Sequence, residues 1–365
     1  MALLPPFLNG SSRKKRAQVI SIDLGSRTTK AVLLERRGES FALTRYAMLE
    51  APIFDKKISP EQLADHFHTI STALQSATKF ISVAVGLGDA VVRQVELPQM
   101  PVDEMRGIMK MNHKSYLQQD LPNHVFDCFI IPPRAEAAPA KAGDAPRNAG
   151  AAFSTKFKVL VAAAKQQLIA DFLQAASLAG LTADALVPSV VGPINAFEMA
   201  LPEVFAKETV ALVDIGFKYT SVSVLDRGEL ATNRVVNIGG NQLTTGLAEM
   251  KNISYAEAEG IKIGMASEVE AELQMQVIPL GREIRASLDF FEHQHDRPVS
   301  QVYLSGGTAR SETIIQMLNS EILTECKTWN PTASLQKTLP GQQAVEIEHV
   351  GPQLAVAIGT ALAAY

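Results

Sequence analysis

The sequence predicts an α/β protein made of two related lobes, and two observations support this prediction. An apolar run followed by an aspartate, an apolar residue and a glycine occurs at 19–25 and again at 210–216, and each copy continues through a short polar turn into a second strand. Elsewhere, strand-like apolar runs alternate with apolar residues at helical spacing. Because the second copy starts about halfway along the 365 residues, we expect two duplicated lobes whose β-hairpin tips face each other.

The composition is that of a folded cytosolic protein. Apolar residues make up 47% of the chain, enough for sizeable cores, and the length suggests two or three domains. A net charge of −4 gives no general attraction to nucleic acid. No run approaches the roughly 20 apolar residues of a membrane-spanning helix, and the start of the chain lacks the pattern of an export signal. Cys128 and Cys326 are therefore expected to be buried, reduced thiols.

The chain begins with a short basic segment. Residues 1–16 contain an apolar tip followed by the cluster Arg13, Lys14, Lys15 and Arg16. We expect this segment to be flexible and solvated, although such a cluster also suits a weak contact with an anionic membrane surface.

The first hairpin is followed by further predicted elements of the first lobe. Residues 31–49 predict a hairpin that turns near Gly38. Residues 59–77 have apolar residues at helical spacing, with Ser59 as the expected N-cap. Residues 80–87 predict a buried strand.

A smaller sheet is expected to follow within the first lobe. Its elements are strands at 91–98, 124–132 and 156–164, a helix at 103–121, and a second helix at 166–181 that ends at Gly180. Alanine, proline and glycine dominate residues 132–152, which indicates an exposed, mobile insertion between two strands of one sheet and not a domain boundary.

The first repeated hairpin has the composition of a phosphate-binding turn. Gly25 permits a tight turn whose backbone N–H groups can hold an anion, and hydroxyl groups and a lysine follow it. Asp23 and Asp214 occupy matching places in the two hairpins, where bare carboxylates at close range would repel each other. A hydrated Mg²⁺ between them removes the repulsion, because Mg²⁺ keeps several waters and needs few carboxylates. The phosphate contacts expected here are Gly25, Ser26, Arg27, Thr28, Thr29 and Lys30.

A third turn completes the predicted site. Residues 301–305 predict an apolar strand, and the following glycine pair leads into a helix, where close backbone approach and the helix N-terminus would favour an anion. Together with the two hairpins, this order predicts a clamp for a Mg-triphosphate. The contacts expected from the second hairpin and the third turn are Gly216, Phe217, Lys218, Tyr219, Gly306, Gly307 and Thr308.

These turns resemble the phosphate and adenosine loops of the actin-like ATPase superfamily, which includes actin, chaperone ATPases, MreB, FtsA and the sugar kinases. The resemblance implies duplicated ribonuclease H-like domains that bind ATP and Mg²⁺ between them, with a helix at 352–363 that returns to the first lobe. It also implies that Glu259 and Lys262 reach the ribose and the adenine. The alternative for this pair is an ordinary ion pair on a helix surface.

Within the superfamily, the chain is similar to the PilM family of type IV pilus assembly, a branch related to FtsA. The similarity covers almost the whole chain from residue 17, and its motifs are NIGGNQLTTGL at 237–247, AEGIK at 258–262, and EIRASLDFF followed by LSGG within 283–307. It adds Gly239 and Gly240 to the expected nucleotide contacts. It implies docking of the short cytoplasmic tail of PilN, a single-span protein of the inner membrane, and hence a location at the cytoplasmic face of that membrane. Other pilus assembly components and self-association are further expected contacts.

The same similarity implies domain boundaries. A small inserted domain of the FtsA type (1C) interrupts the first lobe (1A), and the second lobe divides into 2A and 2B. The expected ranges are 17–89 with 340–365 for 1A, 90–186 for 1C with a flexible loop at 134–154, 187–243 with 280–339 for 2A, and 244–279 for 2B.

Two departures from the superfamily pattern weaken the prediction of an active enzyme. Phe217, Lys218 and Tyr219 are bulky where relatives carry small residues. Val187 stands where relatives often have a glutamate that positions water, and a valine cannot accept a proton. ATP hydrolysis is therefore expected to be slow or absent.

Three other functions remain open at this point: an FtsA-like cell-division protein, a type II secretion scaffold, and a small-molecule kinase of the same superfamily. The first is disfavoured because the sequence ends directly after the last predicted helix, where FtsA-type proteins add an amphipathic helix. A kinase needs an acid to deprotonate its acceptor; Asp184 and Asp89 are candidates, but neither lies in a kinase-like motif. The seven histidines show no metal-binding pattern.

Overall fold

The computed structural model describes residues 16–52, 58–131 and 156–365. Expectations about residues 1–15, about the insertion at 132–152 and about its loop at 134–154 lie outside the described residues. Arg16 is described, and it corrects our assignment to a flexible terminus. Its guanidinium donates to the Asp184 carboxylate over 2.8 and 3.2 Å and lies 3.6 Å from the centre of the Phe80 ring.

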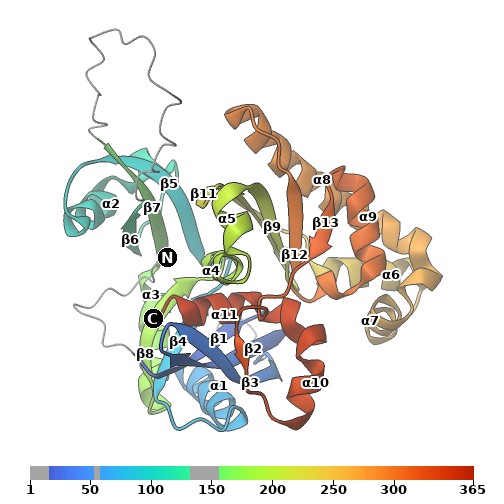
Figure 1. The fold of residues 1–365 in the computed structure, drawn as a ribbon, viewed down its shortest axis with the longest axis horizontal. Coiled ribbons are helices and arrows are strands. Elements are labelled where there is room, and N and C mark those ends of the chain that lie inside the picture. The colour runs from blue at the N-terminus through green and yellow to red at the C-terminus, as the bar shows by residue number, and fades with distance from the viewer. Residues whose placement is uncertain (1–15, 53–57, 132–155) are drawn as a thin grey trace.

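A six-stranded sheet forms the first lobe, in the order β14-β3-β2-β1-β4-β8 (Figure 1). β1, β2 and β3 form an antiparallel meander, and β4 and β8 continue it in parallel. Ile20 and Ile22 of β1 pack with α1 and α3 on one face, while Val19 packs with α11 on the other. The bounds are β1 Gln18–Leu24, β2 Thr28–Arg37, β3 Ser40–Glu50, α1 Pro60–Ala73, β4 Phe80–Val85, α3 Gln166–Leu178, β8 Thr182–Pro188, β14 Gln336–Lys337, α10 Gly341–Val350 and α11 Ala355–Leu362.

The second lobe repeats this plan, as predicted, in a five-stranded sheet of order β11-β10-β9-β12-β13. Its first three strands are again an antiparallel meander, and the next two run parallel to β9. The bounds are β9 Thr209–Ile215, β10 Thr220–Asp226, β11 Glu229–Val236, α6 Gly240–Lys251, α7 Tyr255–Gly264, α8 Glu270–His295, β12 Gln301–Ser305, α9 Glu312–Ile322 and β13 Cys326–Thr328.

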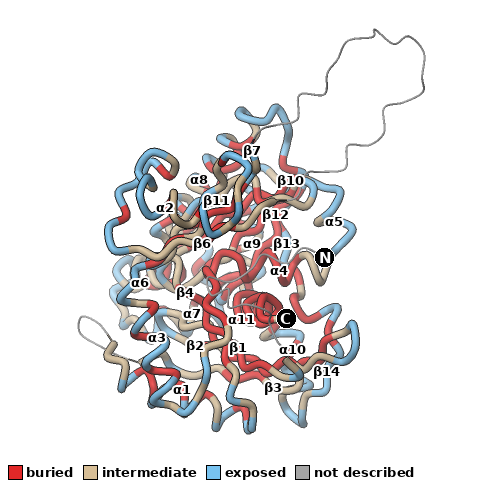
Figure 2. Tube along the Cα trace, turned by 90° about the vertical axis from the view of Figure 1, so that its left-hand side faces the viewer, coloured by how far each residue is buried: buried red, intermediate tan, exposed pale blue. Residues whose placement is uncertain are grey.

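The two lobes share one hydrophobic core. Helix α4 (Val191–Ala200) covers β9 of the second lobe, helix α11 covers β1 of the first, and the two helices pack against each other. They approach so closely that a Cβ atom at Gly359 would lie 1.7 Å from the carbonyl oxygen of Gly192. Figure 2 shows the resulting band of buried chain through the centre of the molecule. The short helix α5 (Pro202–Lys207) leads from α4 to β9.

β5, β7 and β6 form a third, smaller sheet of order β5-β7-β6, whose strand β5 lies beside β11 of the second lobe (Figure 1). It packs against helix α2 around a core of its own that includes Leu97, Met105 and Met109. The bounds are β5 Ala90–Pro98, α2 Val102–Leu117, β6 His124–Ile130 and β7 Lys156–Lys165.

Three of the expected domain boundaries differ from this topology. The chain leaves the small sheet after β7, because α3 packs on α1 and β8 pairs with β4, so the small domain ends well before residue 186. β14 pairs with β3, so the first lobe resumes before residue 340. Helix α8 is continuous through the expected boundary at 279–280.

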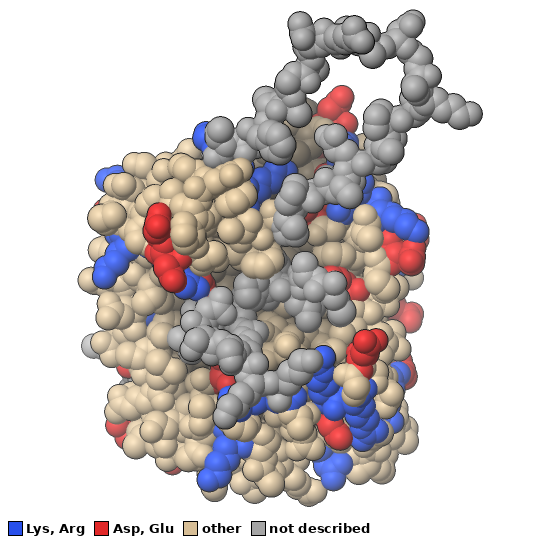
Figure 3. Space-filling model, turned by 60° about the vertical axis from the view of Figure 1, so that its left-hand side comes forward, with Lys and Arg blue, Asp and Glu red and all other residues tan. Residues whose placement is uncertain are grey.

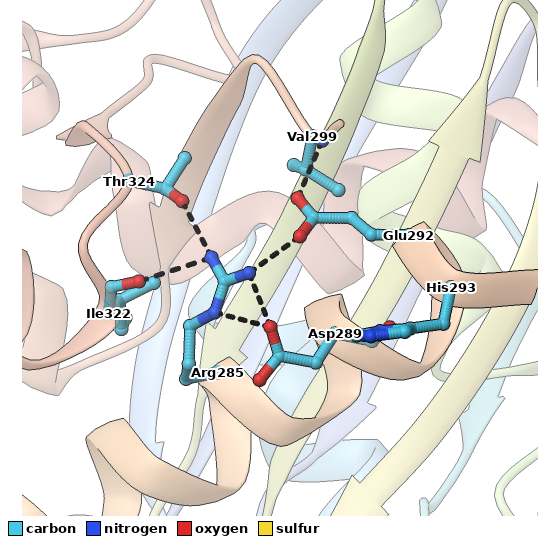
Figure 4. A network of polar contacts seen from close by, with 7 residues as sticks. All are labelled: Arg285, Asp289, Glu292, His293, Val299, Ile322 and Thr324. Carbon is cyan, nitrogen blue, oxygen red and sulfur yellow. Dashed lines mark hydrogen bonds and ion pairs between the residues drawn. The ribbon is translucent and has the colours of Figure 1, made fainter. Parts of the chain in front are cut away.

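The motif EIRASLDFF has a structural role, which Figure 4 shows. Arg285 of α8 donates to the carboxylates of Asp289 and Glu292, to Thr324 Oγ1 over 3.2 Å and to the carbonyl of Ile322 over 3.4 Å. Glu292 in turn accepts a 2.9 Å hydrogen bond from the backbone N–H of Val299. Arg285 therefore joins α8 to the end of α9 and to the segment before β13, and Glu292 extends the network to the segment before β12.

Candidate functional site

The two repeated hairpins bring their aspartates toward each other. Asp23 lies near the end of β1 opposite Lys30 of β2, and the Lys30 ammonium is 3.3 Å from the Asp23 carboxylate. Asp214 has the matching place at the end of β9 and accepts a 2.8 Å hydrogen bond from Ser305 Oγ. The Lys30 ammonium also interacts with the Asp214 carboxylate, so one lysine serves both lobes.

The pKa directions of these groups agree with two carboxylates at close range. Burial opposes the charge on Lys30, but attraction to Asp23 and Asp214 raises the pKa of Lys30 above its ordinary value. Burial raises the pKa of Asp214, and the negative charge of Asp23 adds to this, while Ser305 and Lys30 oppose it. The pair therefore needs a cation, which Lys30 supplies and which a hydrated Mg²⁺ would also supply.

The first turn is tight, and its residues differ in what they offer a ligand. The Gly25 N–H donates to the Asp23 carbonyl over 3.0 Å, and a Cβ atom at Gly25 would lie 2.4 Å from the carbonyl oxygen of Thr28. Ser26 is exposed and Thr28 partly exposed. Thr29 corrects our expectation: its side chain is fully buried, and its hydroxyl is bonded to His66 of α1 over 2.8 Å.

Arg27 crosses from this turn to the second lobe. Its guanidinium donates to Tyr255 Oη over 3.1 Å and lies 3.7 Å from the Glu259 carboxylate, both on α7. It also lies 5.5 Å from the centres of the Phe217 and Tyr255 rings, within the range of a cation–π contact. Arg27 thus bridges the two lobes on the α7 side of the hairpins.

The second turn packs on the start of α6. The backbone N–H groups of Gly240 and Asn241 donate to the carbonyls of Gly216 and Phe217, each over 2.9 Å. A Cβ atom at Gly239 would lie 2.6 Å from the Phe217 carbonyl oxygen. The first N–H groups of this helix are thus satisfied by the turn.

The bulky side chains of the second turn point to different surroundings. The Phe217 ring lies near Arg27, and the Tyr219 hydroxyl lies 3.6 Å from the position of a Cβ atom at Gly88, in the first lobe. Lys218 is exposed. Two of the three residues that depart from the superfamily pattern thus make contacts with the first lobe.

The pair on α7 is not an ordinary surface ion pair. Lys262 is 6% exposed, and its ammonium donates to Glu259 over 2.8 Å, to Thr244 Oγ1 over 2.6 Å and to the Gly240 carbonyl over 3.2 Å. Burial lowers the pKa of Lys262, although the hydrogen bond and the negative charge of Glu259 act in the opposite direction. Burial works against the charge on Glu259, but Lys262, Thr244 and Arg27 together hold the pKa of Glu259 below its ordinary value. Sequence reasoning omitted Thr244 from the site, although Thr244 is the threonine that follows the two glycines in the motif at 237–247.

The third turn lies against the second hairpin and the start of α6. Gly306 has a φ angle of 90°, in the left-handed region, and a Cβ atom there would lie 2.4 Å from the Ile215 carbonyl oxygen. A Cβ atom at Gly240 would lie 2.8 Å from Thr308 Oγ1. The turn therefore meets the second hairpin and the start of α6.

One expectation about the third turn was wrong. The glycine pair leads into a short 3₁₀ turn at Thr308–Arg310, and α9 begins only at Glu312, because the side chain of Ser311 caps it. The N-terminus of α9 therefore does not coincide with the glycine pair. Sequence reasoning did not identify Gln353 as a neighbour of this turn. Its amide oxygen lies 3.8 Å from the position of a Cβ atom at Gly307. Its buried amide nitrogen has no hydrogen-bond partner.

The sequence analysis considered Val187, Asp184 and Asp89 in relation to catalysis. Val187 is fully buried in the shared core, at the end of β8. Asp184 lies toward the other end of β8, and Arg16 holds its carboxylate, which removes one of the two candidate bases of a kinase. Asp89 is exposed in the turn between β4 and β5.

Further sequence expectations are tested over the residues that the structure describes. Both cysteines are buried free thiols, and burial raises the pKa of each to about 12, so they are unreactive at neutral pH. Over the same residues, no helix is long and apolar enough to cross a membrane. No cluster of three or more His, Cys, Asp or Glu side chains suited to a metal occurs in residues 16–52, 58–131 and 156–365.

Two duplicated lobes with paired Asp-x-Gly hairpins and a third glycine turn define the actin-like ATPase fold. The chain resembles the solved "PilM-PilN type IV pilus biogenesis complex" with a TM-score of 0.79 and 22% identity, over 96% of this chain and 99% of that one. The ethanolamine utilization protein EutJ of Carboxydothermus hydrogenoformans resembles it with a TM-score of 0.55 and 15% identity, over 96% of this chain and 91% of that one.

The family model described as "Type IV pilus assembly protein PilM" matches residues 21–365, and the chain belongs to this family. The cell division protein FtsA of Bacillus subtilis (strain 168) is 21% identical over 264 residues, which cover 67% of this chain. The alignment spans 57% of that FtsA.

Proposed function

We propose that this protein is an ATP-binding scaffold of type IV pilus assembly that binds Mg-ATP between its lobes and hydrolyses it slowly or not at all. The observation that carries the proposal is the convergence of Asp23, Lys30 and Asp214 at the hairpin tips, beside a second group formed by Gly240, Lys262 and Thr308. A triphosphate suits the first group and a nucleoside the second.

The roles follow from the chemistry of each group. Asp23 and Asp214 would hold Mg²⁺ through water, and the first and second turns would hold the phosphates with their backbone N–H groups and Lys30. Glu259 and Lys262 would contact the ribose and adenine. Mg²⁺ would supply charge neutralisation of the phosphates. The proposed contacts are Gly25, Ser26, Arg27, Thr28, Lys30, Gly216, Phe217, Lys218, Tyr219, Gly239, Gly240, Glu259, Lys262, Gly306, Gly307 and Thr308.

The first prediction concerns the metal. In the variant Asp23→Asn with Asp214→Asn, calorimetry should show that ATP affinity no longer depends on Mg²⁺, because both carboxylates that hold the hydrated ion are gone. Asp89→Asn is the matched control, since Asp89 is an exposed carboxylate outside the hairpins. An unchanged Mg-ATP affinity in the double variant would contradict the proposal.

Turnover by the unaltered protein should stay below about one per second, an ordinary enzyme rate.

The proposed partner is the cytoplasmic tail of a PilN-like membrane protein. The similar solved structure is named as a PilM-PilN complex, which supports such a partner for a family member. We place the tail between the first lobe and the small sheet, where Phe129 and Leu160 pack against the start of α4. On the face in Figure 3, the visible charged side chains are of both signs and are separated by uncharged areas. Such docking would hold the protein at the cytoplasmic face of the inner membrane.

The second prediction concerns the small sheet. Ala90 of β5 pairs with Ala164 of β7, so the two ends of this sheet are adjacent, and residues 90–165 can be replaced by a short glycine-serine linker. The deletion should abolish capture of the neighbouring membrane protein's tail while Mg-ATP affinity stays unchanged, because α3 and β8 remain with the first lobe. Retained capture by a protein that still binds ATP would place the tail elsewhere.

A further inference from the structure

Arg27 is bound to the second lobe by only part of its guanidinium. It donates one hydrogen bond, to Tyr255 Oη over 3.1 Å, and the Glu259 carboxylate lies 3.7 Å away. Because a guanidinium has five N–H donors, these contacts with described residues leave donors for a further acceptor. The Arg27 side chain is 45% exposed, so it can turn toward another partner without disturbing a packed core.

The phosphate turns need a further cation. Asp23, Asp214 and Lys30 together carry one net negative charge when both carboxylates are ionised, and the Lys30 ammonium interacts with both of them. A hydrated Mg²⁺ would change this to one net positive charge, whereas a triphosphate carries several negative charges. The other basic residues of the first and second turns are Arg27 and Lys218. Arg27 is the one of these two that is bound to α7.

Arg27 loses little when it exchanges α7 for a phosphate. Its ion pair with Glu259 is partly exposed, and exposed ion pairs contribute little to stability. Glu259 keeps other partners, because the Lys262 ammonium donates to its carboxylate over 2.8 Å and Thr244 Oγ1 donates to it as well. A hydrogen bond between a guanidinium and a phosphate is charge-assisted at both ends and is therefore stronger. The exchange of partners is favourable on this balance.

We propose that Arg27 is a switch between α7 and the nucleotide. When a nucleotide binds, the Arg27 guanidinium leaves Tyr255 and Glu259 for one of its phosphates, and α7 loses this link to the first lobe. The inference rests on the proposed Mg-ATP site and adds a regulation of that site. A nucleoside without phosphate does not operate the switch, because the ligand must bind Arg27 better than α7 does.

The test measures hydrogen–deuterium exchange at the amides of residues 255–264 in the unaltered full chain and in Arg27→Ala. Without nucleotide, Arg27→Ala should speed this exchange about two- to fivefold, the effect expected from the loss of an exposed ion pair. With saturating adenosine the same difference should remain. With saturating Mg-ATP the two proteins should exchange alike, because Arg27 of the unaltered protein is then bound to phosphate.

Affinities provide a second measurement. In calorimetry, Arg27→Ala should weaken Mg-ATP binding several-fold and adenosine binding by much less. Arg27→Gln, which keeps most of the side chain but not its charge, should behave in the same way. Arg37→Ala, at an exposed arginine of the same lobe, should match the unaltered protein in both measurements.

Three results would overturn the switch. A difference at α7 that persists with saturating Mg-ATP would show that Arg27 stays on α7. No difference without nucleotide would show that its contact does not hold α7, and a difference that vanishes with adenosine would show that phosphate is not the trigger. If calorimetry shows no Mg-ATP binding to the unaltered protein, the proposed function fails, and the switch fails with it.

Discussion

At the residue scale, the sequence predicted best the positions that are set by the local backbone. Asp23, Gly25 and Asp214 follow from strand ends and tight turns, which a short sequence specifies. Thr29 could not be assigned this way, because its buried position depends on His66, which lies in a helix 37 residues away. For the same reason the contact of Arg27 with α7 has no signal in the sequence near Arg27.

The third prediction concerns Glu259 and the pH dependence of stability. The pKa of Glu259 in the folded protein lies below its ordinary value of 4.5. The ionised carboxylate therefore stabilises the folded protein fully at pH values above 4.5. This stabilisation is lost as the pH falls through the pKa of the folded state. Glu259→Gln should therefore lower the free energy of unfolding by about 1–3 kcal/mol at neutral pH, the usual cost of losing a hydrogen bond to a charged partner.

The difference between Glu259→Gln and the unaltered protein should shrink as the pH falls below 4.5, measured by urea unfolding at a series of pH values. The matched control is Glu257→Gln, an exposed glutamate of the same helix. A difference that stays constant through this pH range would mean that Glu259 stabilises the fold by packing and not by its charge.

At the scale of elements, apolar periodicity predicted where strands and helices occur but not which sheet they join. α3 and β8 illustrate this: the range expected for the inserted domain, 90–186, includes all of α3 and most of β8, and they complete the first lobe instead. A period of 2 or 3.6 residues specifies that one face is buried, but not the surface that buries it. The duplication was informative because the second copy of the hairpin indicated a second lobe related to the first.

The fourth prediction concerns the junction of α8 with α9. Arg285→Met keeps much of the side-chain volume but removes the donors to Ile322 and Thr324 and leaves two carboxylates without their partner. We expect a loss of about 1–3 kcal/mol in the free energy of unfolding. The denaturant midpoint measures it, with the exposed Arg282→Met as control; equal midpoints for the two variants would rule out a structural role of the network in Figure 4.

At the scale of the whole molecule, two of the junctions between the lobes differ in kind. The core around α4 and α11 is continuous through both lobes, and beside the hairpins Arg27 and Tyr219 reach from one lobe to the other. The first junction is apolar and closely packed, whereas the second consists of a few polar and aromatic contacts. We therefore expect the second junction to be the weaker of these two.

The fifth prediction follows from this difference. Arg27→Ala should weaken the contact with α7, so that backbone amides at 255–264 exchange hydrogen for deuterium faster and bound ATP dissociates several times faster. Arg37→Ala, at an exposed site of the same lobe, should change neither. Unaltered exchange in α7 together with an unaltered ATP dissociation rate would show that Arg27 does not hold the lobes together.

The glycine contact between α4 and α11 is the place where a rotation of one lobe against the other would pivot. Gly192 and Gly359 let the two helix backbones touch, which leaves no space for a sliding motion between them. When a rigid body turns about a fixed point, each part moves in proportion to its distance from that point. A small rotation about this point would therefore move the outer strands of each sheet further than the residues beside α4 and α11.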